Sequence, residues 1–453
     1  MSISSVGFRR VSIVVFIIIA LTLVACTQVA PSVHKNTLSS DPVVRWIQQN
    51  AVPLRTVNPG GSDSDFASLQ QIVGHASIVG LGEETHGTHE FYDIKARLAE
   101  FLITKLGFTT FIMENDWGTS QLIDAYINSG SGNIDNVMQA GLFVSWQTQE
   151  YHALLEWMRA YNADPVHTTK IHFLGMDCQG VSQRDFAAVE NYLQRVDRQQ
   201  AITIQQLYAP IITASLPNPY ATYVSLGVST KQQYQNQAQQ VYDLLKAHQQ
   251  EYIYHSSPQS FALALQNARI IVQFTTYLNY DTQNEALTRY YQRDTFMAEN
   301  VTWIHDHTAG SNPKIIVWAH DGHIANDTFY NSQDGRNMGG ELRTRYKDSY
   351  LSIGTTLYQG AFRVYHYPET STQQIPTPNL DTYNYDLGQA NLPLYMLNLR
   401  KVPFGPVANW ANSFTDIFLN YGLGGEDLSS ICVLSQWFDV IIHVQKTAPS
   451  NPL

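Results

Sequence analysis

Short apolar runs recur along the chain and predict a set of β-strands. Each run is rich in Ile, Val, Leu and Phe and is bounded by polar or turn-forming residues, as buried strands are. The runs are residues 76–82, 108–113, 171–176, 314–318, 350–357 and 438–444. Stretches of helical periodicity separate them, which favours right-handed crossover connections. We therefore expect an α/β fold with a three-layer core, in which a mostly parallel sheet has helices on both faces.

The clearest helical pattern follows the first run. Apolar residues recur at spacings of three and four from Phe91 to Leu102, which predicts a helix over residues 84–106. Gly107 comes directly after it, and glycine is common at helix C-termini. This helix would connect the first two strands of the sheet.

The segment between the third and fourth runs is much longer than one crossover helix needs. Helical patterns cover residues 233–252, 258–280 and 285–306, so we expect a helical subdomain over residues 181–308. It would be inserted between two parts of the core, residues 42–180 and 309–446, with residues 447–453 as a tail. Two stretches rich in turn-forming residues, 209–232 and 366–394, are interpreted as irregular lid or rim loops.

The N-terminus predicts export. Two arginines precede an apolar run, residues 11–24, that is shorter than the roughly 20 residues of a membrane-spanning helix. Small residues and Cys26 follow in a pattern that resembles the lipobox of bacterial lipoproteins. We expect residues 1–25 to be a signal peptide, Cys26 to be lipidated and residues 26–41 to be a tether to the cell membrane. The alternatives are an ordinary signal peptide and an uncleaved anchor.

Composition and charge narrow the range of partners. Apolar residues make up 44% of the 453 residues, enough for a full hydrophobic core. Lys and Arg number 27 against 38 for Asp and Glu, and this net charge of −11 argues against nucleic acid, which needs a basic face. Three cysteines are too few for a disulfide scaffold. Nothing near Cys178 marks it as an activated nucleophile, and its pairing with Cys432 is left open.

Ionisable residues gather where four of the predicted strands end. They are Glu83, His86 and His89 after the first run, Glu114 after the second, Asp177 after the third, and His320 and His323 after the fourth. Ligands bind beyond the carboxyl ends of the strands in a parallel sheet, so these side chains are predicted to line one cleft. Structural explanations exist for single members: Glu83 could interact with a helix dipole, and Asp177 could be a cap.

These residue types favour hydrolysis by activated water. No Gly-x-Ser-x-Gly motif occurs, which disfavours a serine hydrolase of the α/β-hydrolase type. Histidine suits the role of general base because its ordinary pKa of about 6.5 lies near neutrality. His86 is the candidate base, oriented by Glu83 or Glu114. The oxyanion would be stabilised by His320, His323 or a cation from the first helix.

Metal binding is a rival interpretation of the same cleft. Its histidines and glutamates contain enough ligands for a zinc-type site, although no His-Glu-x-x-His motif is present. One alternative is therefore a metal-dependent hydrolase. Another is a surface lipoprotein that binds a metal or a tetrapyrrole without turnover. We expect no cofactor in the leading hypothesis and leave a divalent metal open.

The motifs resemble those of the erythromycin esterase family. The matching segments are Gly82-Glu83-Glu84-Thr85-His86-Gly87-Thr88-His89-Glu90, Gly107-Phe108 with Glu114, Gly175-Met176-Asp177, Arg293-Asp294 with Met297 and Asn300, Trp318-Ala319-His320-Asp321-Gly322-His323, Gly339, Gly354 and Phe438-Asp439. The resemblance covers about residues 45–445. It implies a three-layer α/β core, a helical subdomain and hydrolysis of a macrolide lactone, the chemistry of antibiotic resistance.

The resemblance also implies roles for residues. His86 matches the family's general base. Glu83, Glu114, His320 and His323 match the family's residues around the same cleft. The candidates for substrate binding are Lys95, Arg97, His89, Asp177 and Arg293. The family implies a basic residue on the first helix, where Lys95 and Arg97 lie. Arg293 could instead pair with Asp294. The lipobox departs from the soluble, intracellular resistance enzymes. The expected substrate is therefore a carboxylic ester or a macrolide lactone, hydrolysed outside the cytoplasm by a lipid-anchored enzyme.

Overall fold

The computed structural model describes most of the chain beyond the N-terminus. The described residues are 38–218, 222–280, 285–308, 310, 312–327, 335–366, 369–420 and 429–453. The expected signal peptide, the lipidation site Cys26 and most of the expected tether lie outside the described residues. Within these ranges, no helix is both long and apolar enough to cross a membrane.

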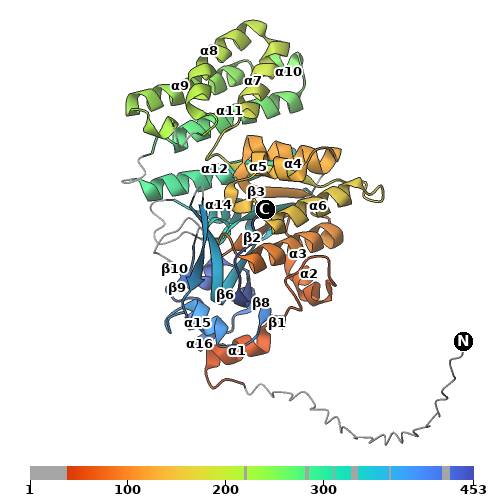
Figure 1. Ribbon diagram of the computed structural model, residues 1–453, viewed down its shortest axis with the longest axis vertical. Coiled ribbons are helices and arrows are strands. Elements are labelled where there is room, and N and C mark those ends of the chain that lie inside the picture. The colour runs from red at the N-terminus through yellow and green to blue at the C-terminus, as the bar shows by residue number, and fades with distance from the viewer. Residues whose placement is uncertain are drawn as a thin grey trace, which may run out of the picture. The chain divides into compact units, whose positions relative to one another are not determined.

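Nine strands of the described chain form one mixed sheet (Figure 1). Their order is β1-β8-β11-β6-β2-β5-β3-β4, and β7 pairs with β6. The pairs from β11 to β4 are parallel, while β1, β8 and β7 join by antiparallel pairs. This confirms the predicted mostly parallel sheet.

The strand bounds follow the apolar runs of the sequence. The sheet contains β1 Val52–Pro53, β2 Ile78–Glu83, β3 Thr110–Asp116, β4 His172–Asp177, β5 Ile315–His320, β6 Tyr350–His366, β7 Glu369–Ile375, β8 Leu394–Asn398 and β11 Val440–Thr447. A separate two-stranded sheet consists of β9 Thr415–Phe418 and β10 Ser429–Cys432. All six predicted runs are strands.

Helices precede, connect and follow the strands. Those of the first part of the core are α1 Pro42–Asn50, α2 Ala67–Val73, α3 His89–Leu106, α4 Trp117–Ser129, α5 Ile134–Gly141 and α6 Gln149–Ala163. The long insertion contains α7 Gln183–Val196, α8 Arg198–Ser215, α9 Val228–Ala247, α10 Gln249–Tyr254, α11 Pro258–Tyr277 and α12 Ala286–His307. The later helices are α13 Asp321–Ile324, α14 Met338–Tyr346, α15 Tyr383–Gly388, α16 Pro406–Ala411 and α17 Leu434–Trp437.

Two expected irregular loops contain regular structure instead. The stretch 209–232 includes the end of α8 and the start of α9, and Pro210 lies inside α8. Burial of Tyr208 and Ile211 beside it favours the helix despite the lost backbone donor. The stretch 366–394 contains β7 and α15, because β6 runs on beyond the apolar pattern and pairs with β7.

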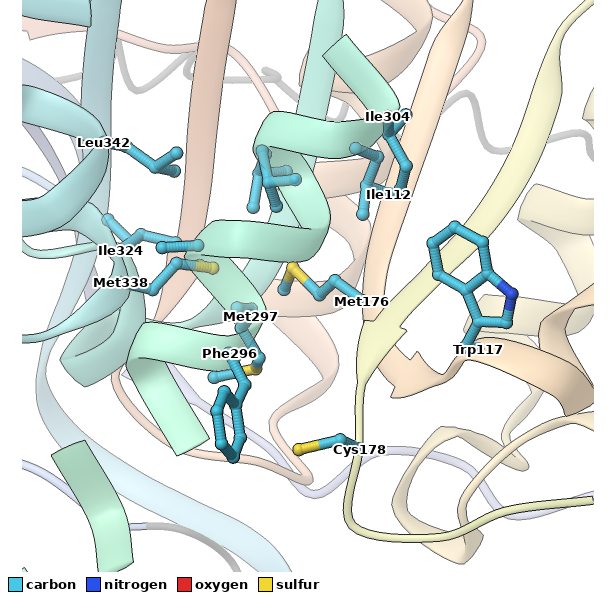
Figure 2. Close-up of a cluster of buried hydrophobic side chains, with 14 of the residues drawn as sticks. Ile112, Trp117, Met176, Cys178, Phe296, Met297, Ile304, Ile324, Met338 and Leu342 are labelled. Atoms are coloured by element: carbon cyan, nitrogen blue, oxygen red, sulfur yellow. The ribbon is translucent and has the colours of Figure 1, made fainter. Parts of the chain in front are cut away.

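Each face of the sheet carries its own apolar core, which confirms the three-layer arrangement. Helices α3 and α6 cover one face, where Phe91, Leu98 and Leu155 are buried. On the other face, α12 packs over β4 and α14 over β6, and Figure 2 shows Met297, Met338 and Met176 in the apolar core of this face. Cys178 and Cys432 are both buried and free of disulfide bonds.

The inserted helices are connected to the sheet through α12. Helices α7, α8, α9 and α11 pack against one another, and α11 also packs against α12 (Figure 1). In turn, α12 packs against β4 and α14 at the sheet. Helix α12 therefore contacts the rest of the insertion through α11 and the sheet through β4. In this way the insertion contributes a helix to the region where the strands end.

Glycine at position 175 brings α4 close to β4. A Cβ atom there would collide with the backbone carbonyls of Asn115 and Asp116 and with the Ser120 hydroxyl. Close approach of this kind is a common reason for glycine within a strand. It fixes the end of β4, where Asp177 lies, against the end of β3.

Candidate active site

Four neighbouring strands deliver the predicted polar residues to one edge of the sheet. The strands lie in the order β2-β5-β3-β4, all parallel, so their carboxyl ends coincide. Glu83 is the register partner of His320, and Asp116 is the register partner of Asp177. The sheet order itself therefore brings together segments that are far apart in the sequence.

His86 and Glu83 form a hydrogen-bonded pair. The loop after β2 turns the imidazole back, so that His86 Nδ1 lies 2.9 Å from Glu83 Oε1. Since the carboxylate can only accept, Nδ1 carries the proton in this pair and the lone pair of the ring is on Nε2. Glu83 also pairs with Lys95 of α3. Among the two predicted basic candidates on this helix, Lys95 is the one that reaches the site.

The surroundings of His86 keep its imidazole neutral. The ring of Trp146 meets it edge-on at a centroid distance of 4.6 Å, and the ring of His320 lies 5.0 Å away. Burial lowers the pKa of His86 to about 4, although the Glu114 carboxylate acts in the opposite direction. Above this pH the imidazole can accept a proton.

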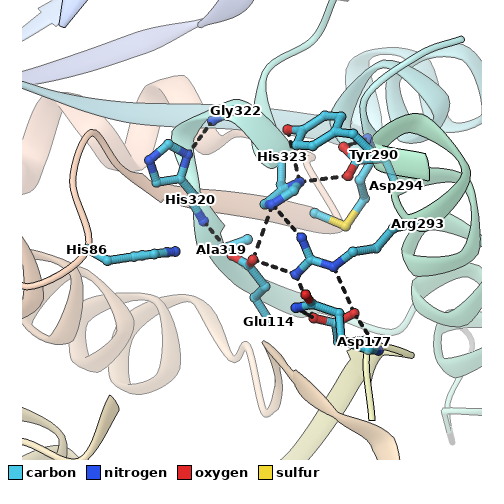
Figure 3. Close-up of polar contacts among 12 residues, drawn as sticks. His86, Glu114, Asp177, Tyr290, Arg293, Asp294, Ala319, His320, Gly322 and His323 are labelled. Atoms are coloured by element: carbon cyan, nitrogen blue, oxygen red, sulfur yellow. Dashed lines mark hydrogen bonds and ion pairs between the residues drawn. The ribbon is translucent and has the colours of Figure 1, made fainter. Parts of the chain in front are cut away.

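Glu114 lies at the centre of the site (Figure 3). One carboxylate oxygen, Oε1, accepts from Arg293 at 2.7 Å and lies 3.1 Å from His323 Nε2. The other, Oε2, accepts from the backbone N–H of His320 at 2.9 Å. Burial alone would raise the pKa of Glu114, but the charges of His323 and Arg293 outweigh it and hold this pKa well below its ordinary value.

Arg293 of α12 joins two strand ends. Its Nε donates to Asp177 Oδ1 at 2.9 Å and its Nη2 donates to Asp177 Oδ2 at 2.5 Å, a bidentate pair. The same Nη2 bonds to Glu114. The expected alternative, an ion pair with Asp294 on the helix surface, is wrong, because the guanidinium is buried and faces the sheet.

His323 is held between two carboxylates. Its Nδ1 lies 2.7 Å from Asp294 Oδ1, and its Nε2 faces Glu114. Although burial lowers the pKa of His323, the charges of these two carboxylates raise it to about 9. The Tyr290 ring stacks on the imidazole at 5.1 Å. This raised pKa favours the imidazolium at neutral pH, and Nη1 of Arg293 lies 3.0 Å from the same Nε2.

His320 is the neutral neighbour of this cation. Its Nδ1 accepts from the backbone N–H of Gly322 at 3.2 Å, which places the ring proton on Nε2, 3.3 Å from the carbonyl of Asn420. Burial, together with the charges of His86 and His323, lowers the pKa of His320 well below its ordinary value. Of the three histidines of the site, His86 and His320 are thus neutral, and His323 carries the positive charge.

Two predicted substrate-binding residues lie elsewhere. Arg97 pairs with Asp65 at 2.5 Å and donates to the carbonyls of Thr56 and Ser62, because its position on α3 faces that loop rather than the strand ends. His89 pairs with Glu150 at 2.6 Å. That hydrogen bond raises the pKa of His89 to about 9, and the side chain is a third exposed, at 32%.

The sequence reasoning missed the full contribution of α12 and of one aromatic residue. Tyr290 and Asp294 flank Arg293 at a spacing typical of one helix face, and both contact His323. Polar residues at this spacing on a helix that is otherwise buried were the available signal. Trp146 lies in a short helical turn, and no pattern in its neighbourhood pointed to His86.

Protein groups already bond to most of the donor atoms that the metal alternative would use. Across the described ranges, no three His, Cys, Asp or Glu side chains are arranged as a metal-ligand set. Both ring nitrogens of His320 and of His323 already face hydrogen-bonding groups. The Arg293 guanidinium lies between Glu114 and Asp177, so it supplies the positive charge that a cation would otherwise bring.

The comparisons with known proteins cover most of the chain. A family model for erythromycin esterase matches residues 103–447, more than half of the chain. The chain belongs to the erythromycin esterase family. An Escherichia coli protein named erythromycin esterase type II is 27% identical over 351 residues, which make up 72% of this chain and 80% of that protein. Membership of this family suggests a hydrolase that acts on esters.

Solved structures of relatives share the fold. A Bacillus cereus protein matches with a TM-score of 0.82 and 31% identity over 90% of this chain and 98% of that one. A mutant of the erythromycin esterase EreC in its open conformation matches with a TM-score of 0.70 and 18% identity, over 88% and 98% of the two chains. The second likeness, at its lower identity, concerns the fold alone.

Removing the cation of the site should destabilise the protein strongly. In Arg293→Met, Glu114 and Asp177 would stay buried without their counter-charge, so the free energy of unfolding should fall by about 3–5 kcal/mol. Urea unfolding at pH 7, followed by far-UV circular dichroism, measures this loss. Because the pKa of Glu114 is lowered in the folded protein, the stabilisation is complete above its unfolded pKa and is lost as the pH falls through the folded one.

A surface arginine provides the matched control. Arg345 pairs with Asp306 at 3.1 Å, and both side chains are largely exposed. Arg345→Met should therefore change the free energy of unfolding by at most about 1 kcal/mol. Equal losses in the two variants would contradict the central role given to Arg293.

Proposed function

We propose that this protein hydrolyses a carboxylic ester or a lactone, with His86 as the general base that activates water. The observation that carries the proposal is the His86–Glu83 pair, which faces His320 and the His323 cation. A neutral imidazole and an imidazolium in one site supply a proton acceptor and a positive charge at the same pH. Family membership supports an ester as the substrate class.

The proposed first step is attack by water on the carbonyl carbon. His86 takes a proton from the water at Nε2 while the water oxygen forms the new bond to carbon, and the carbonyl oxygen becomes an oxyanion. Glu83 stabilises the imidazolium that forms, because its carboxylate already accepts from Nδ1. Lys95 donates to the other oxygen of the Glu83 carboxylate and so fixes its orientation.

The second step breaks the bond between the carbonyl carbon and the alcohol oxygen. The oxyanion re-forms the carbonyl, and the departing alkoxide takes up the proton that His86 received from water. The positive charge of His323 would stabilise the negative oxygen in both steps. In a lactone the acid and the alcohol stay within one product, so a macrolide ring would be opened without being cut in two.

Loss of the base should abolish most of the activity. In His86→Ala no group remains to take the proton from water, so kcat/KM should fall by roughly 100- to 10,000-fold. The measurement is product-resolved mass spectrometry on simple acyl esters and on a macrolide lactone. His172→Ala is the control, because His172 pairs with Asp124 at 3.2 Å on the exposed surface outside the site, and it should keep close to the wild-type rate. Coinciding rates for His86→Ala and wild type would remove the proposal.

The pH dependence of kcat/KM should follow the two shifted histidines. A general base must be unprotonated, and with the pKa of His86 lowered to about 4, activity should be retained at pH 6 and lost only as the pH falls through about 4. On the alkaline side, activity should decline as the pH rises through about 9, where His323 loses its charge. Circular dichroism at each pH checks that the protein stays folded. An acid limb centred near 6.5, the ordinary value for histidine, would contradict this assignment.

We also propose that the protein is exported and anchored to the cell membrane through a lipid on Cys26. The support is the signal-like N-terminus and its lipobox-like end. Cys26→Ser should move the protein from the membrane fraction to the soluble fraction of the bacterial envelope, as measured by fractionation and immunoblotting. Retention of the variant in the membrane fraction would favour an uncleaved anchor instead.

A further inference from the structure

Gly87, the residue that directly follows His86, is held by the nearby helix α3 and by two distant parts of the chain. The N–H of Gly87 donates to the Tyr92 hydroxyl on α3 at 2.6 Å. Its carbonyl accepts from the backbone N–H of Arg363 on β6 at 2.9 Å and from that of Ser450, beyond β11, at 2.8 Å. Both polar groups of this residue are therefore bound from outside the loop.

The backbone conformation at this position is also restricted to glycine. Gly87 has a φ of +83°, in the region that favours glycine. A Cβ atom there would collide with the backbone carbonyl of Arg363. The loop thus turns sharply after His86, and β6 lies against the turn.

The segment of residues 448–453, here called the C-terminal segment, runs along this loop. Its Ser450 is fully buried, and the Ser450 carbonyl accepts from Arg363 Nε at 2.8 Å. Isolated β-bridges join Thr88 to Pro449 and Thr148 to Pro452. Figure 1 places this end of the chain beside α6. The segment predicted to be a simple tail therefore packs between the His86 loop and the start of α6.

We propose that the C-terminal segment is a latch that positions His86, with Ser450 and Tyr92 as its positioning residues. The proposal rests on the proposed function of His86 as the base. None of these groups needs to touch the substrate. They act on Gly87, and through it on the angle at which the imidazole meets Glu83 and Trp146. Displacement of a catalytic group by about 1 Å can lower a rate by roughly 100-fold.

A released loop would also change the environment of the imidazole. The charged or titratable groups that face His86 are Glu83 from β2, Glu114 from β3, His320 from β5, His323 from α13 and Arg293 from α12. These groups would stay in place, since their own contacts do not involve Gly87. Water would reach the ring more easily, so the pKa of His86 should rise from about 4 towards its ordinary value.

The first pair of variants tests the backbone bond from Ser450. Ser450→Pro removes the N–H that donates to Gly87, whereas Ser450→Ala keeps that N–H and loses only the side-chain contact with Tyr365. We expect kcat of Ser450→Pro to fall about 10-fold or more with little change in KM. Ser450→Ala should stay much closer to the wild type.

The second pair tests the other side of Gly87 with a smaller change. Tyr92→Phe removes the hydroxyl that accepts from Gly87 and leaves the ring in its aromatic cluster. Tyr151→Phe is the matched control, because its ring packs against Tyr92 at 5.0 Å and its hydroxyl does not bond to Gly87. This pair decides the question if Ser450→Pro fails to fold.

Two readouts separate positioning from general stability. Steady-state kinetics on an ester that the wild type hydrolyses gives kcat and KM, and an NMR titration of labelled histidine gives the pKa of the His86 ring. A lower kcat in Ser450→Pro and Tyr92→Phe, with a pKa of His86 raised by about one unit or more, supports the latch. Wild-type values of kcat and pKa in both variants would overturn it, as would equal losses in the two controls.

The NMR titration also distinguishes failure of the latch from failure of the proposed function. If the wild type hydrolyses no ester, the proposed function fails, and the pKa of His86 in the four variants still decides whether the segment holds the loop. The wild type could instead be active while Ser450→Pro and Tyr92→Phe keep the wild-type kcat and the wild-type pKa of His86. In that case the latch fails and the proposed function stands.

Discussion

The structure of the site depends on the balance of charge around the buried Glu114 carboxylate. Two further carboxylates, Asp177 and Asp294, lie in the same interior, where each ion without a partner would cost several kcal/mol. Arg293 and the His323 imidazolium supply the compensating charges. Since these two cations come from α12 and α13, the carboxyl ends of the strands and the helix that covers them form one electrostatic unit.

That balance gives two histidines of one site opposite properties. His86 has one carboxylate partner and lies against Trp146, so burial dominates and the ring is neutral. His323 lies between two carboxylates, so the nearby charges dominate and the ring is protonated. Both side chains are buried, and the charges that face each ring differ: the His323 and Arg293 cations lower the pKa of His86, whereas Asp294 and Glu114 raise that of His323.

Local patterns in the sequence predicted the parallel core and most of the residues at the strand ends. Each strand is a buried apolar run, and the polar residue that follows it lies in the same short segment of sequence. Glu83, His86, Glu114, His320 and His323 could be assigned to one edge for this reason. The choice between Lys95 and Arg97 could not be made, since it depends on which face of α3 meets β2. The position of Trp146 depends on packing between distant segments, and so does the contact of residues 448–453 with the His86 loop. Such long-range packing leaves no mark in a local pattern.

The late position of Arg293 in the chain has a consequence for biosynthesis. It lies 179 residues after Glu114, on the last helix of the long insertion. While the ribosome is still making that insertion, Glu114 and Asp177 at the emerged strand ends have no Arg293 to pair with, and burying them is unfavourable. The nascent chain is therefore expected to keep this edge hydrated and to close it only when α12 has been made. Fragments that stop short of α12 would carry the glutamates and His86 yet have no assembled hydrolytic centre.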